Sequence, residues 1–309
     1  MHPAWSIIFF TSISGLGLGL AGLIVLGFLD LSLFLHLLVA SFAVFGLIGA
    51  GLLSSTLHLG HPERAWRALS QWRSSWLSRE GVLAILVLAS LGCWFAFTFF
   101  FGPPPLWCGI LILLLIVATV YATSMIYGSL KTVACWHHPL TPVCYLMFSA
   151  CGGSVAFLTM LALFGQPTPG ILTEITLTFL IGAWTLKYAW WWALDNRVSA
   201  SNLETATGLG TIGKVRSLMP PHTSENYLQK EMGFVVARRH AIKLRYISIF
   251  FGALLPIICV IFGGSSAGLL SMATIFHIIG IFVERWLFFA EAKHVVTLYY
   301  GDEQLSIAS

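Results

Sequence analysis

The amino-acid sequence predicts an all-α membrane protein, a polytopic bundle of eight transmembrane helices in one domain over residues 1–309. Three observations support this fold class: few charged residues, long continuous apolar segments, and turn-forming residues between those segments. Hydrophobic residues make up 58% of the chain and charged residues only 9%, with a mean hydropathy of +0.87. A soluble domain contains about 25% charged residues because its surface faces water, so most of this surface is expected to face lipid.

The apolar segments have the length that a membrane span requires. A bilayer core about 30 Å thick is crossed by roughly 20 apolar residues in a helix. Helices are preferred to a β-barrel because the apolar runs are continuous rather than alternating. The eight expected spans cover residues 4–29, 31–57, 81–101, 106–128, 140–164, 171–193, 244–263 and 267–290.

Turn-forming residues separate these expected spans. They are Asp30, residues 102–105, Pro139, residues 165–167 and residues 263–266. The first apolar stretch has no basic segment before it and is longer than the apolar part of a signal peptide. It is therefore expected to remain in the protein as a span.

All of the positive charge is expected on one side of the membrane. The 16 Lys and Arg residues lie in residues 58–80, at Lys131, in and beside residues 194–243, and at the end of the last span. The connections after the first, third, fifth and seventh spans contain none. Basic loops favour the cytoplasmic side, which predicts cytoplasmic termini and basic loops. Residues 194–243 are too few and too polar for a catalytic core and are expected to form a docking or capping loop.

Two motifs typical of soluble proteins are excluded. Residues 17–22 match G-x-G-x-x-G, but they lie within a span rather than between a strand and a helix. Gly15, Gly19 and Gly22 share one helix face, which predicts a close contact with a neighbouring helix. The six cysteines form no C-x-x-C pair and are interpreted as small apolar residues rather than as zinc or iron–sulfur ligands.

Two histidines, His36 and His277, lie within expected spans. Paired intramembrane histidines at matched depth on facing helices can bind b-type haem, but the sequence contains no clear pair of pairs. Structural hydrogen bonding is therefore the preferred interpretation, and a b-type cytochrome is kept as an alternative.

The connection between the second and third spans brings an imidazole and a carboxylate to one membrane boundary. His58 is expected to end one helix and Glu80 to open the next. Three further residues flank this pair: Ser55, Arg64 and Trp76. A quinone headgroup needs a hydrogen-bonding group, a proton relay and apolar walls. An interfacial anchor explains the same residues, and a helix start at Ser78 would explain Glu80 without a function.

A second polar cluster is expected late in the last span. Its residues are Glu284, Arg285, Glu291, Lys293 and His294, with Lys187 on the same side of the membrane. Ionised groups inside a membrane are costly and are often functional. A buried structural ion pair is the alternative interpretation.

Several motifs give the sequence a family resemblance. They are Leu57-His58-Leu59-Gly60-x-Pro62-x-Arg64-Ala65 with Leu77-Ser78-x-Glu80, then Tyr127-x-Ser129-x-x-Thr132-Val133-x-x-Trp136, Thr141-Pro142 and Gly152-Gly153. With these motifs the protein resembles the membrane anchor subunits of dimethyl sulfoxide reductase and related complex iron–sulfur molybdoenzymes, most of all the anchor of cytoplasmic membrane-bound sulfite dehydrogenase. The resemblance covers the eight-span plan, and residues 194–243 are its least similar part.

The resemblance implies a quinone-reactive anchor that contains no haem and no metal. Its partners would be a four-cluster iron–sulfur subunit and a molybdopterin catalytic subunit, at a bacterial cytoplasmic membrane. The resemblance assigns quinone binding, of ubiquinone or menaquinone, to His58 and Glu80. To that site we add five residues of our own: Arg64, Trp76, Ser55, Glu284 and Arg285.

The expected topology favours one subtype of this family. The resemblance places the catalytic subunits of dimethyl sulfoxide reductase outside the cytoplasm, whereas the connection from His58 to Glu80 is Arg-rich and expected to be cytoplasmic. If site and soluble partner share a face, the catalytic subunits are expected to be cytoplasmic. This favours the sulfite dehydrogenase type, in which electrons flow from sulfite to quinone. The alternatives are an anchor that passes electrons from quinol to a reductase, and a transporter, for which an internal repeat and polar residues at the midplane would be expected.

Overall fold

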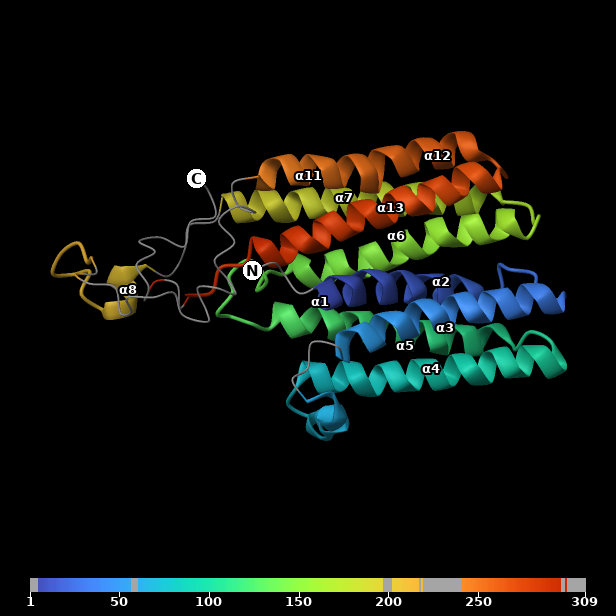
Figure 1. Ribbon diagram of the computed structural model, residues 1–309, viewed down its shortest axis with the longest axis horizontal. Helices are drawn as coiled ribbons and strands as arrows, with labels where there is room; N and C mark the ends of the chain where they lie inside the picture. The colour runs from blue at the N-terminus through green and yellow to red at the C-terminus, as the bar shows by residue number, and fades with distance from the viewer. Residues whose placement is uncertain are drawn as a thin grey trace.

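Long helices that run side by side account for most of the structure (Figure 1). The computed structural model describes residues 5–56, 61–196, 202–216, 218, 240–295 and 298. An isolated β-bridge joins Val133 to His294. The elements of the bundle are α1 (Trp5–Phe9), η1 (Phe10–Ser14), α2 (Gly15–Val25), α3 (Phe34–Thr56), α4 (Trp76–Phe101), α5 (Leu106–Gly128), α6 (Leu140–Leu163), α7 (Gly170–Asp195), α11 (Ala241–Ile249), η3 (Phe250–Leu254), α12 (Leu255–Gly263) and α13 (Ala267–Ala290).

The predicted helical membrane fold is confirmed for the described residues. Seven helices there are long and apolar enough to cross a membrane, counting Trp5–Val25 and Ala241–Gly263 as one span each. The expected span at 171–193 corresponds to α7, a 26-residue helix that is not among the seven. Glu174, Lys187 and several threonines lower the hydropathy of α7, although the helix packs along α6 like the others.

The predicted breaks fall close to the observed helix ends. Gly102 ends α4 with a φ of 86°, a conformation that favours glycine. Asp30 accepts a hydrogen bond from the Ser32 amide at 2.9 Å, and its own amide donates to Gln166 Oε1 at 3.0 Å. The turn after α2 is thereby tied to the turn after α6.

The N-terminal span lies at the centre of the bundle rather than at its edge. It packs against α3, α5 and α6, and 67% of its most apolar window is buried. Its helix is interrupted by the π-helical turn η1, and a second π turn, η3, interrupts the span that continues into α12. Such turns leave the normal hydrogen-bond register and occur often at functional sites.

The closest helix contact joins α2 to α6. A Cβ atom on Gly19 would overlap the Ser149 carbonyl oxygen, and one on Gly153 would overlap the backbone of Gly19. Ser149 Oγ also donates to the Gly15 carbonyl at 2.7 Å. The predicted close contact is therefore confirmed at Gly19, whereas a Cβ on Gly15 would meet nothing within 4 Å. Residues 17–22 are helical throughout, which agrees with the rejection of a nucleotide loop.

One end of the bundle collects the segments that contain the described Lys and Arg residues (Figure 1). There lie the 3₁₀ helix η2 (Pro62–Gln71), the start of α4, the α5–α6 turn, the ends of α7 and α13, and the start of α11. The short helix α8 (Leu203–Thr207) projects beyond this end (Figure 1). It belongs to the expected docking loop, of which residues 197–201, 217 and 219–239 lie outside the described residues.

Candidate functional site

Glu80 lies inside α4 rather than at its start. Ser75 caps the helix in an extended conformation and accepts a hydrogen bond from the Ser78 amide at 3.4 Å. The helix therefore begins at Trp76, and the expectation that Glu80 opens it, or that Ser78 starts it, is wrong. A capping role does not explain Glu80.

Glu80 is a buried carboxyl group in an apolar part of the bundle. Its side chain is 5% exposed, and its Oε1 is 2.5 Å from the hydroxyl oxygen of Thr123 on α5. It forms no ion pair with any residue that the structure describes. Burying a carboxylate without a cation is costly, so the neutral acid is the favoured form in these surroundings.

The surface beside Glu80 is rich in tryptophan and arginine. The Arg79 guanidinium lies 4.3 Å from the centre of the Trp76 ring and donates to the carbonyls of Trp72 and Arg73. Trp76 in turn meets Tyr121 of α5 edge to face at 5.8 Å. These contacts join the turn after η2 to the first turn of α4 and form an aromatic wall at the membrane boundary.

The other site residues predicted beside Glu80 are placed as follows. His58 lies outside the described residues, which omit 57–60. Ser55 is half-buried near the end of α3, and its hydroxyl donates to the Leu52 carbonyl at 2.7 Å. Arg64 is exposed in η2, 3.7 Å from Glu63. The structure therefore brings Trp76 and Glu80 onto the same end of α4 and leaves Arg64 at the solvent-facing surface.

Glu284 and Arg285 belong to a second cluster. Lys187 Nζ is 2.6 Å from Glu284 Oε1, and Arg285 Nε donates to Glu284 Oε2 at 2.6 Å. All three side chains are at most 3% exposed. Lys187 Nζ lies 3.5 Å from the centre of the Trp190 ring, and the Arg285 guanidinium 4.1 Å from that of Tyr145. Aromatic faces thus help to stabilise two buried cations that share one anion.

A third group of charges ties three helices together at the same end. Arg245 of α11 binds both carboxylate oxygens of Asp195 at the end of α7, and binds Glu291 after α13. Burial raises the pKa of Glu291 above its ordinary value, although the nearby Arg245 guanidinium opposes that shift. The ion pair with Arg245 gives Glu291 a structural role.

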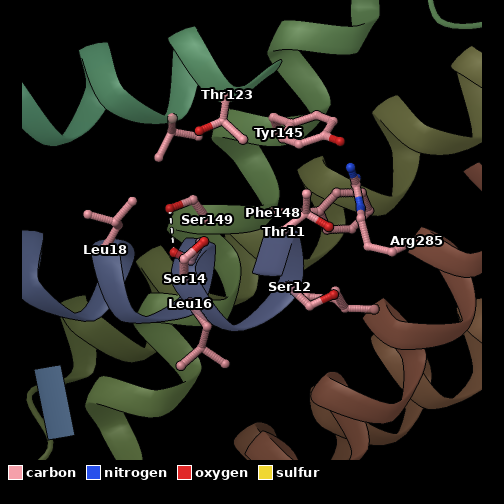
Figure 2. Close-up of a pocket in the computed structure, with 13 residues that line it drawn as sticks. Thr11, Ser12, Ser14, Leu16, Leu18, Thr123, Tyr145, Phe148, Ser149 and Arg285 are labelled. Carbon is pink, nitrogen blue, oxygen red and sulfur yellow. Dashed lines mark hydrogen bonds between the residues drawn. The ribbon is translucent and has the colours of Figure 1, made fainter. Parts of the chain in front are cut away.

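A small cavity of about 20 Å³, lined by both hydroxyl-bearing and apolar side chains, lies between Thr123, the partner of Glu80, and the second cluster. Figure 2 shows Thr123, Tyr145 and Arg285 on one side of it and hydroxyl side chains of η1 on another. Sequence reasoning missed Thr123 because threonine is common in membrane helices. The available signal was its position four residues after Thr119, which places two hydroxyls on one face of an apolar helix.

The two intramembrane histidines have hydrogen-bonding partners inside the protein. His277 Nδ1 lies 2.7 Å from the Gly252 carbonyl in the π turn η3. His36 stacks on Phe164 at 4.2 Å and lies 3.2 Å from Gln166 Nε2. These contacts support the structural interpretation of both residues.

The fold and the buried polar groups define a multi-pass helical membrane protein with polar sites near one end of its bundle. The family model described as DMSO reductase anchor subunit (DmsC) matches residues 1–301. The protein belongs to this family. It is 30% identical to a sulfite dehydrogenase subunit of Allochromatium vinosum, over 97% of its own length and 99% of that protein. It is 27% identical to a component of the anaerobic dimethyl sulfoxide reductase of Escherichia coli, over 42% of its own length and 46% of that protein.

Proposed function

We propose that this protein is the quinone-interacting anchor subunit of a molybdopterin and iron–sulfur oxidoreductase, and that it passes electrons from sulfite to the quinone pool. Membership of the anchor family supports the anchor role. The similarity to a sulfite dehydrogenase subunit along almost the whole sequence supports the subtype.

The observation that supports a quinone site most directly is the buried acid Glu80, which has no ion-pair partner among the described residues and lies beside an aromatic wall at the basic end of the bundle. A quinone accepts two electrons and two protons when it is reduced to a quinol. Glu80 is suited to hold a proton at the membrane boundary, and Trp76 to cover an aromatic ring. In this proposal His58 and Ser55 donate hydrogen bonds to the quinone. Arg64 binds the quinone at the outer edge of the site, and Glu284 with Arg285 provides fixed charge deeper in the bundle.

The proposal includes the arrangement of the complex. With α7 as an eighth span, all basic segments share one side, which the positive-inside tendency makes cytoplasmic. A four-cluster iron–sulfur subunit and the molybdopterin subunit then dock at this face of a bacterial inner membrane, with the 194–243 loop at the contact. The runner-up is an anchor that delivers electrons from quinol to a reductase, which the similarity to a dimethyl sulfoxide reductase component favours.

Replacing Glu80 with Gln in the assembled complex is expected to lower quinone-linked sulfite oxidation by about 100-fold or more, the range for loss of a positioned proton donor. His58→Gln is also expected to lower quinone-linked sulfite oxidation. Sulfite oxidation with a soluble artificial electron acceptor should remain normal, because the catalytic subunit is untouched.

Glu63→Gln is the matched control, since Glu63 is an exposed carboxylate in η2 of the same connection. Normal quinone-linked activity in both the Glu80 and the His58 variants would sink the assignment. Solute uptake into vesicles that contain only this protein would instead favour the transporter.

A further inference from the structure

The cavity beside Thr123 has the size and lining of a site for one water molecule. Its volume is about 20 Å³, and a cavity of at least about 10–15 Å³ with two to four polar partners can hold a water. Hydroxyl-bearing side chains of η1, α5 and α6 line part of it: Thr11, Ser12, Ser14, Thr123, Tyr145 and Ser149.

The polar groups of this cavity are unevenly satisfied. Thr11, Ser14 and Ser149 already donate their hydroxyl protons to backbone carbonyls, at 3.0, 2.6 and 2.7 Å. Ser12 Oγ, Tyr145 Oη and Arg285 Nη1 are buried and have no hydrogen-bond partner among the described residues. A buried polar group without a partner is costly. A single water accepts from two donors and donates to two acceptors, so it can accept from Arg285 and Ser12 and still donate to the Tyr145 oxygen.

Thr123 connects this cavity to Glu80. Its hydroxyl oxygen is 2.5 Å from Glu80 Oε1 and 3.1 Å from the Thr119 carbonyl. A hydroxyl has one proton to donate, so it cannot donate to both oxygens. Both hydrogen bonds form together only when Glu80 is the neutral acid and donates its own proton to Thr123. When Glu80 is ionised, the Thr123 hydroxyl donates its proton to the Glu80 carboxylate instead of to the Thr119 carbonyl.

We propose that the cavity binds one water that links the Glu80–Thr123 pair to Arg285, and that Thr123 is a positioning residue for Glu80 in both its neutral and its ionised form. The water accepts from Arg285 and Ser12 and donates to Thr123 when the Thr123 proton has turned to Glu80. The functional part of this inference rests on the proposed quinone site, where Glu80 gives its proton to a quinone oxygen. The water site itself does not.

The other titratable groups near Glu80 do not replace this link. Tyr127 of α5 and Tyr145 of α6 interact with Glu80 electrostatically and form no hydrogen bond with it among the described residues. The Arg79 guanidinium on α4 donates to the Arg73 carbonyl after η2. Arg285 of α13 is bound to Glu284. Among the described residues, Thr123 is therefore the hydrogen-bonding contact of the Glu80 carboxyl group.

Infrared spectroscopy of the purified full-length protein tests the Thr123 contact without any quinone. The C=O stretching band that disappears in Glu80→Gln belongs to the neutral Glu80 acid. Thr123→Val is expected to move this band to higher frequency because the acid loses its hydrogen bond, and Thr123→Ser is expected to restore it. Thr119→Val is the control, since that hydroxyl bonds only to the Leu115 carbonyl of its own helix. An unmoved band in Thr123→Val, or no such band in the native protein, overturns the proposal.

Thermal unfolding of Ser12→Ala tests the water. If the Ser12 hydroxyl binds a water, its removal lowers the melting temperature. If the cavity is dry, the same change deletes an unpaired buried hydroxyl, and the melting temperature stays equal or rises, which overturns the water site. Ser154→Ala is the matched control, because Ser154 is a buried serine that bonds within its own helix.

Quinone-linked turnover of the complex separates this inference from the proposed function. Thr123→Val is expected to slow turnover by about tenfold or more, and Thr123→Ser to preserve it. If the infrared and thermal results hold while neither Glu80 nor Thr123 affects turnover, the water site stands and the quinone site fails.

Discussion

Glu284→Ala is expected to destabilise the protein more than any other single change in its buried charges. The variant leaves Lys187 and Arg285 buried with no anion bound to either. Removing one member of a buried ion pair costs about 3–5 kcal/mol. The expected result is a sharply lowered melting temperature in detergent and reduced recovery from the membrane.

The order of effects is the sharper test of this cluster. Glu284→Gln is expected to be nearly as harmful, because it keeps the shape but not the charge. Lys187→Met is expected to cost much less, since Glu284 and Arg285 remain as a neutral pair at 2.6 Å. Glu174→Ala, a carboxylate on the exposed face of α7, serves as the control. A Lys187→Met variant as unstable as Glu284→Ala would contradict the assignment of Glu284 as the shared anion.

The second large effect is expected at the contact between α2 and α6. Any side chain at Gly153 must displace the backbone of α2, because a Cβ there overlaps Gly19. Gly153→Ala is expected to cost about 1–3 kcal/mol, the usual range for overpacking, and Gly153→Leu to cost more. Close approach through small residues is a common basis of helix association in membranes.

Gly46→Ala is the matched control for this prediction. Gly46 also lies inside a helix, but a Cβ there meets nothing within 4 Å. Alanine is a better helix former than glycine by up to about 1 kcal/mol, so this variant should be equally or more stable. Melting temperatures of both variants decide the matter, and equal values for Gly153→Ala and Gly46→Ala would show that the contact is not tight.

Hydropathy predicts most of the helices because lipid imposes one simple requirement, a long apolar segment. The expected helix at 171–193 is present as α7, but Lys187 and Glu174 lower its hydropathy, so it is not among the seven helices apolar enough to cross a membrane. Hydropathy misses the π turns η1 and η3, because a changed hydrogen-bond register leaves the apolar pattern intact.

Charge makes the central residue of the candidate site predictable from the sequence. Glu80 stands out in an apolar segment, whereas its partner Thr123 does not, because a threonine satisfies itself by bonding to its own helix. The sequence predicts Glu284, Arg285 and Lys187 in one polar cluster because they share a side of the membrane. The structure confirms the contact between Lys187 and Glu284, whereas the direct pairing at 2.6 Å is a detail that spacing alone does not encode.

The central position of the first span has a consequence for biosynthesis. This helix leaves the ribosome before α5 and α6, and the residues against which it packs in those two helices are made more than 80 residues later. Its hydroxyls at Thr11, Ser12 and Ser14 are buried in the finished bundle. Until α6 arrives, the face that α6 covers in the finished bundle lacks its partner in this chain. Nascent polypeptides that end before Leu140 therefore lack the helix that covers this face of the first span.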